Sequence, residues 1–154
     1  TYRYAKFKDL ASREACVNFY VSQVDAINNW DLVDLSCYKI LGHWLFDKDK
    51  QLLYDWAKEN HLWKQRIAMI TCMHFVKQGE FKDALAIADL LQHHPHDLIH
   101  KAVGWILREI GKENEQLLVD YLTPRYKEMP RTMLRYAIER FEEGKRKAFL
   151  HSKV

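Results

Sequence analysis

The chain has 154 residues, of which 48% are hydrophobic and 29% are charged, and its net charge at pH 7 is +3. This length and balance predict one soluble globular domain spanning residues 1–154, with a single continuous core. No apolar run approaches the roughly 20 residues needed to cross a bilayer, and no signal-peptide pattern opens the chain, so we expect no membrane partner.

The cysteine and histidine patterns argue against stapled or metal-bound folds. Cys16, Cys37 and Cys72 are odd in number and form no Cys-x-x-Cys pair, which favours reduced thiols in the cytosol. Four histidines surround Pro95, but no carboxylate or cysteine accompanies them at ligand spacing. No nucleotide-binding fingerprint or Ser–His–Asp order is present. We therefore expect no metal and no cofactor.

Positive charge is concentrated at the end of the chain. From Thr123 onward nine Lys or Arg oppose four Glu, giving +5, so the preceding residues sum to −2. A basic end on a near-neutral body suggests a polyanionic partner, although a solvated helical face gives the same pattern. The basic residues are Arg125, Lys127, Arg131, Arg135, Arg140, Lys145, Arg146, Lys147 and Lys153.

Helical periodicity recurs from end to end, and alternating strand patterns are absent. Residues 1–10 are aromatic and basic without a clear period, and could be the frayed end of a helix. Gly79 and Gly111 are expected to be left-handed C-cap residues, and Pro95 and Pro130 fall at helix starts. The predicted helices cover about 12–27, 30–46, 50–58, 62–78, 81–92, 97–110, 113–122, 130–143 and 145–150.

The predicted helices also pair. Long helices begin near Trp30, Leu62, Asp97 and Pro130, each after a helix that is usually shorter. This spacing is the period of an α-helical repeat. It predicts an all-α solenoid of four antiparallel helix pairs, in which the second helix of each pair lines a concave, basic groove. A compact, irregular helical bundle is the alternative.

One carboxylate stands out on these helices. Asp34 follows Trp30 by four residues, and its other helical neighbours include Cys37 and Tyr38, so it lies in a mostly apolar stripe. Such a group is either hydrogen-bonded in the core or has a chemical task. Asp31 is more simply explained as a first-turn partner of the helix dipole.

Later helices carry matching residues near their middles. Arg66 lies among Leu62, Trp63, Met69 and Ile70, and is therefore an ion in an apolar stripe. If the inner helices line one groove, Arg66 converges there with Trp30, Trp105, Arg131 and Arg135, a set suited to phosphates and a cationic centre. A structural Asp34–Arg66 ion pair would explain both residues without any function. Trp44, Trp56 and Trp63 are expected to be core residues.

Four segments, taken in order, resemble the AlkD-type DNA alkylation repair proteins: 28–34, 63–68, 101–112 and 129–139. The resemblance covers about Tyr20 to Phe141. It implies a HEAT-like α-solenoid that excises cationic alkylated purines (3-methyladenine or 7-methylguanine) from double-stranded DNA, as a monomer in the bacterial cytosol or nucleoid. Family members have further N-terminal helices, including a Gly-rich aromatic segment, so we expect this chain to be a C-terminal portion or a shortened member.

The resemblance also implies residue roles. Asp34 matches the catalytic aspartate, Trp30 and Trp105 match the tryptophans beside the lesion nucleotide, and Arg66 matches an arginine that holds DNA phosphates. The DNA-binding set is then expected to comprise Arg66, Lys101, Arg108, Arg131 and Arg135. The alternatives are a solenoid that binds DNA or branched nucleic acid without catalysis, and a protein-interaction scaffold. A binder gains nothing from a carboxylate facing phosphates, so this residue set favours the glycosylase.

Overall fold

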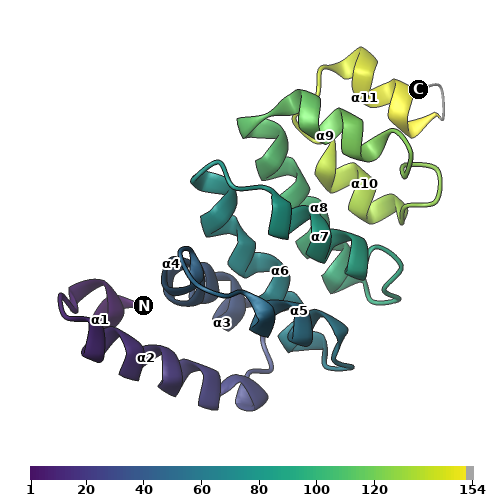
Figure 1. The fold of residues 1–154 in the computed structure, drawn as a ribbon. Helices are drawn as coiled ribbons and strands as arrows, with labels where there is room; N and C mark the ends of the chain where they lie inside the picture. Colours follow the sequence, from purple (N-terminus) through teal and green to yellow (C-terminus); the bar gives the residue numbers. More distant parts are fainter. Residues whose placement is uncertain (152–154) are drawn as a thin grey trace.

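The computed structural model describes residues 1–151, and every regular element among them is helical. The helices form a stack in chain order, with α1 at one end and α11 at the other (Figure 1). The elements are α1 (Tyr2–Lys6), α2 (Leu10–Ser22), η1 (Val24–Ala26), α3 (Trp30–Asp34), η2 (Tyr38–Gly42), α4 (His43–Leu45), α5 (Gln51–Lys58), α6 (Leu62–Lys77), α7 (Lys82–Leu91), α8 (Asp97–Glu113), α9 (Glu115–Leu122), α10 (Arg131–Ala137) and α11 (Glu143–Leu150).

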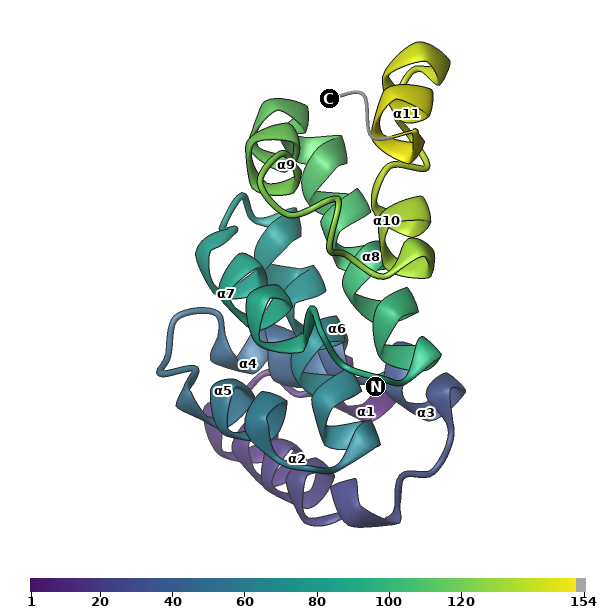
Figure 2. The same cartoon turned by 90° about the vertical axis from the view of Figure 1, so that its right-hand side faces the viewer.

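Two rows of helices make up the stack. The helices α6, α8 and α10 lie side by side in one row, and α3 precedes them against α6. The helices α5, α7 and α9 form the other row (Figure 2). Each pair is antiparallel because its loop is short. The predicted α-solenoid is therefore confirmed, and the compact bundle is not what the chain forms.

The core runs through the middle of this stack. Helix α6 is buried on every face from Gln65 to Met73, so other elements must cover it on all sides there. It contacts α3, η2, α5, α7 and α8, and the side chains of Ile67, Met69, Ile70 and Phe75 are fully buried. Of the three tryptophans predicted to be core residues, Trp56 is buried, whereas Trp44 and Trp63 are half-buried against the core.

The predicted helix over 30–46 is interrupted in the structure. Helix α3 ends at Asp34, and the chain continues through the π-helical turn η2 into α4. The Ser36 hydroxyl donates to the Leu32 carbonyl, a contact that bends helices. At Gly42 a Cβ would lie 2.6 Å from the Cβ of His74 and 2.8 Å from the Thr71 carbonyl oxygen, so α6 approaches too closely for any other residue.

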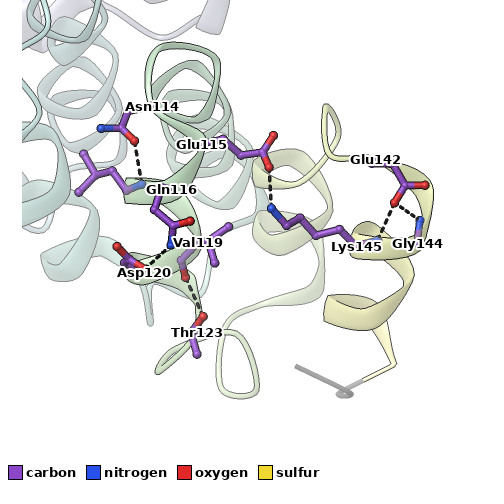
Figure 3. Close-up of polar contacts among 10 residues, drawn as sticks. Asn114, Glu115, Gln116, Val119, Asp120, Thr123, Glu142, Gly144 and Lys145 are labelled. Atoms are coloured by element: carbon purple, nitrogen blue, oxygen red, sulfur yellow. Dashed lines mark hydrogen bonds and ion pairs between the residues drawn. The ribbon is translucent and has the colours of Figure 1, made fainter.

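Other boundaries confirm or correct the capping predictions. Gly79 has a φ of +81° after α6, as expected of a C-cap glycine. Gly111 does not cap α8, which continues to Glu113. Asn114 instead separates α8 from α9, and its Oδ1 accepts from the Leu117 N–H at 3.0 Å (Figure 3). The predicted 130–143 helix is also shorter, since α10 ends at Ala137.

Candidate functional site

A pocket of about 410 Å³ opens on the side of the stack formed by the row that contains α6, α8 and α10. Side chains from α3, α6, α8 and α10 line it, so segments distant in sequence meet there. The lining residues are Trp30, Asp34, Arg66, Leu98, Lys101, Trp105, Arg108 and Tyr136. The structure thus brings together six of the predicted site residues, Arg131 and Arg135 being the two that do not line the pocket.

An ion pair between Asp34 and Arg66 forms one wall. Arg66 Nε donates to Asp34 Oδ1 at 3.0 Å, and Nη2 donates to Oδ2 at 2.7 Å, which is the two-pronged geometry of a strong guanidinium–carboxylate pair. Arg66 Nη1 donates to the Leu98 carbonyl oxygen. The Arg66 side chain is only 6% exposed, and that of Asp34 is 13% exposed. The arginine is therefore almost wholly enclosed, while the carboxylate retains an edge on the pocket.

The two predicted tryptophans line the same pocket as this pair, and they come from different helices. Trp30 is the first residue of α3. Asn29 caps the N-terminus of this helix, because its Oδ1 accepts a hydrogen bond from the Asp31 N–H at 2.9 Å. Trp30 is 51% exposed, an unusual position for so large an apolar side chain. Trp105 is half-buried in the middle of α8. The aromatic surface at the pocket is thus available to a ligand, at least on Trp30.

The cations of the site are already paired with acids. Lys101 Nζ lies 2.7 Å from Asp97 Oδ2, and this contact raises the pKa of Lys101 and lowers that of Asp97. Arg108 donates from Nη1 to Glu139. A DNA phosphate at either cation would therefore replace a surface carboxylate.

The predicted arginines outside the pocket lie on α10. Arg131 Nη2 donates to the Leu150 carbonyl at 2.8 Å and so ties α10 to α11. Arg135 is exposed. Lys153, the last basic residue of the C-terminal segment, lies outside the described residues.

Two residues that line the pocket, Leu98 and Tyr136, were not predicted from the sequence. Leu98 contributes its backbone carbonyl to Arg66, which no residue-type signal reveals. Tyr136, at 36% exposed, reaches the pocket because α10 packs on α8 at Gly104, where a Cβ would lie 2.5 Å from the Cβ of Tyr136. A glycine in mid-helix costs up to about 1 kcal/mol relative to alanine, so Gly104 was the available signal of a close helix contact.

The histidine cluster near Pro95 has a local structural role. The histidines near Pro95 serve the loop before α8: His94 Nδ1 accepts from the His96 N–H, and His96 Nδ1 accepts from the Leu98 N–H. Within residues 1–151 no group of three or more His, Cys, Asp or Glu side chains is arranged to hold a metal ion. Over the same residues, no helix combines the length and the apolar character required to cross a bilayer.

Comparison with known proteins gives one match of large extent. A family model described as DNA alkylation repair enzyme matches residues 2–141. No curated protein matches the chain. The match covers most of the chain, including every helix that contributes to the pocket, so the chain belongs to the DNA alkylation repair enzyme family.

Proposed function

We propose that this protein is a DNA glycosylase that hydrolyses the N-glycosidic bond of cationic alkylated purines, of the 3-methyladenine or 7-methylguanine type, in duplex DNA. The family gives the protein a role in DNA alkylation repair. One observation supports the finer assignment: the Asp34 carboxylate, held by Arg66, lines the same pocket as Trp30 and Trp105. The substrate partner is double-stranded DNA, and no cofactor takes part.

The chemistry needs few catalytic groups. A purine alkylated at N3 or N7 already carries a positive charge, so it leaves without being protonated. Ordinary glycoside hydrolysis uses two carboxylates, one of them as the acid. Here a single carboxylate suffices, facing the positively charged sugar that develops and orienting the attacking water.

The ion pair with Arg66 prepares Asp34 for this task. A carboxylate offers about four lone-pair positions. The guanidinium takes one on each oxygen, which fixes the orientation of the group and leaves the other positions for water or the sugar. Because the charge is in place before the reaction, no reorganisation is needed at the transition state.

The burial of Arg66 changes its expected role. Its three donor nitrogens all have protein acceptors, two on Asp34 and one on Leu98. We therefore assign Arg66 to positioning the carboxylate. Phosphate binding passes to Lys101 and Arg108 in the pocket, together with Arg131 and Arg135 on α10.

The tryptophans supply the second electrostatic element. An aromatic face attracts a cation by about 0.5–2 kcal/mol, depending on how far water is excluded. Trp30 and Trp105 would stabilise both the cationic lesion and the sugar cation that follows it. Recognition then relies on charge and backbone contacts, and not on a tight base pocket.

The test is the substitution Asp34→Asn, measured by single-turnover release of 7-methylguanine from methylated duplex DNA. We expect the rate to fall by about 100-fold or more, the usual effect of removing one preorganised electrostatic group. Binding to the same duplex should persist, because the lost charge does not face the phosphates. The matched control is Asp31→Asn, which removes a carboxylate one turn earlier that is exposed and outside the pocket.

A rate for Asp34→Asn equal to that of the parent would overturn the catalytic assignment. The second candidate function is a solenoid that binds DNA without catalysis, which the Asp34–Arg66 pair favours insofar as it satisfies both charges structurally. A parent protein that binds methylated duplex but releases no base in any single-turnover experiment would support this second function. If a DNA column did not retain the protein, both nucleic-acid functions would be excluded and a protein-interaction scaffold would be the remaining candidate.

A further inference from the structure

A second pocket, of about 250 Å³, adjoins the candidate site along the contact between α8 and α10. Arg108 lines both pockets, so its side chain forms the partition between them. Lys112 of α8 and Arg140, which follows α10, also line the second pocket, with Glu115 of α9 opposite. The two pockets together form an interrupted groove between the helices.

Most charges around this second pocket are satisfied within the protein. Lys112 Nζ lies 2.7 Å from a Glu109 oxygen. Glu115 accepts from Lys145 of α11 at 2.6 Å (Figure 3). Arg140 is exposed and has no acidic partner among residues 1–151. The pocket therefore carries one unbalanced positive charge, on Arg140.

Arg108 is incompletely satisfied as well. Its Nη1 donates to Glu139, but its Nε is buried without a hydrogen-bond acceptor, the nearest carboxylate oxygen being 3.6 Å away on Glu109. A buried donor without an acceptor destabilises the arrangement that holds it. The Glu139 side chain is 50% exposed and could turn into water at little cost. Arg108 is therefore held by two acids, the enclosed Glu109 at its Nε and the exposed Glu139 at its Nη1, and only the second is open to exchange.

We propose that the second pocket is a phosphate subsite for the DNA strand that passes through the candidate site, and that the phosphate replaces Glu139 on Arg108. A backbone phosphate carries one negative charge and several acceptor oxygens, which suits the outer end of the Arg108 guanidinium, now bonded to Glu139, and the free charge of Arg140. The strand's course through the first pocket rests on the proposed function. Glu139 then acts as a stand-in for phosphate while DNA is absent.

The distances along α8 fit one strand. From Trp105 to Arg108 the helix rises about 4.5 Å, and from Trp105 to Lys112 about 10 Å. Successive phosphates on one strand are about 3.4 Å apart along the duplex axis. The second pocket therefore lies within about three nucleotides of the lesion position.

The proposal predicts opposite signs for two substitutions, measured as affinity for undamaged duplex over a range of salt concentrations. Glu139→Gln should strengthen binding by about fivefold, the effect of removing one like charge some 4 Å from a phosphate in water. Arg140→Gln should weaken binding and reduce the salt slope by about 0.9, because one fewer phosphate is neutralised. Thermal unfolding of each variant establishes that it is folded.

The matched controls lie on α11. Glu143→Gln is the control for Glu139→Gln, because it removes a negative charge from an exposed residue outside the pocket. Arg146→Gln is the control for Arg140→Gln, because it removes a positive charge from an exposed residue outside the pocket. A Glu139→Gln effect no larger than that of Glu143→Gln, or weaker binding by Glu139→Gln, would overturn the proposal. So would an Arg140→Gln slope equal to that of Arg146→Gln.

A scan with single uncharged methylphosphonate linkages locates the subsite on the DNA. We expect one linkage near the lesion at which the neutral substitution lowers the affinity of the parent but not that of Arg140→Gln. If every linkage that weakens binding by the parent also weakens binding by Arg140→Gln, the assignment is wrong. These binding measurements involve no base excision. Opposite shifts in a protein that never excises a base would therefore support the subsite while the proposed glycosylase function fails.

Discussion

At the scale of single residues, the most consequential group is the buried guanidinium of Arg66. Replacing it by methionine keeps much of the volume but leaves Asp34 without its partner. Removing one member of a buried ion pair typically costs about 3–5 kcal/mol, and the partial exposure of Asp34 places this pair at the lower end. We therefore expect Arg66→Met to reduce the free energy of unfolding by about 3 kcal/mol, measured by urea denaturation.

The double variant Asp34→Leu, Arg66→Met is the control for this prediction. With both charges gone no uncompensated ion remains, so much of the lost stability should return. Arg66→Lys keeps the charge but cannot make the two-pronged contact, and should fall between the parent and Arg66→Met. An Arg66→Met protein as stable as the parent would mean that the pair contributes nothing to folding.

The predictability of the site follows from the chemistry of each residue. Asp34 and Arg66 were identifiable because each puts a charge into an apolar helical stripe, and the structural pairing of the two was among the readings of the sequence. The structure contains that pair, as the structural alternative predicts, and Asp34 also lines the pocket, so the catalytic role of Asp34 stays a prediction. The Leu98 carbonyl could not be found, because a backbone acceptor carries no residue-type signal.

At the scale of helices, the contact between α8 and α10 depends on Gly104. A Cβ there would lie 2.5 Å from the Cβ of Tyr136 and 2.6 Å from the Met133 carbonyl oxygen. The second contact is backbone, which cannot move without displacing α10. We expect Gly104→Ala to lower the free energy of unfolding by about 1–3 kcal/mol, the usual cost of overpacking, although alanine is the better helix former. Chemical denaturation measures the difference.

Gly111→Ala is the matched control in the same helix. A Cβ at Gly111 would meet Cδ2 of Leu118 at 2.5 Å, but this atom is the end of a flexible side chain and can rotate away. The gain in helix propensity then offsets the remaining cost, so the stability should stay close to that of the parent. Equal losses in the two variants would show that the backbone approach at Gly104 is not the cause.

The helices themselves were predictable where local pattern decides. The prediction for 62–78 agrees with α6 within one residue at its end, because a capping position, a long apolar run and a C-cap glycine coincide. The prediction for 30–46 missed the break between α3 and η2. At that break the Ser36 hydroxyl donates to the Leu32 carbonyl, a side-chain contact with the backbone that hydrophobic periodicity does not register.

At the scale of the whole molecule, a solenoid distributes its stability unevenly, because each repeat contacts only its neighbours. Helix α6 has 16 residues and neighbours on all sides, and its buried residues run almost without a break from Gln65 to Val76. Helix α2 has 13 residues, of which only Val17 is buried. Figure 1 shows α1 and α2 at one end of the stack, where only one side is covered by other helices.

Hydrogen exchange of the native protein should therefore follow this gradient. We expect the amides of α6 and α8 to exchange most slowly, since their opening requires the core to separate, and those of α1 and α2 to exchange fastest through local unfolding. Helix α11, which buries Phe149 against Tyr126 and Phe141, should lie between the two. Mass spectrometry of peptides after timed exchange gives the comparison. Uniform protection from α2 to α10 would contradict this prediction, because it would mean that the stack unfolds as one unit and that α2 is as stable as α6 and α8.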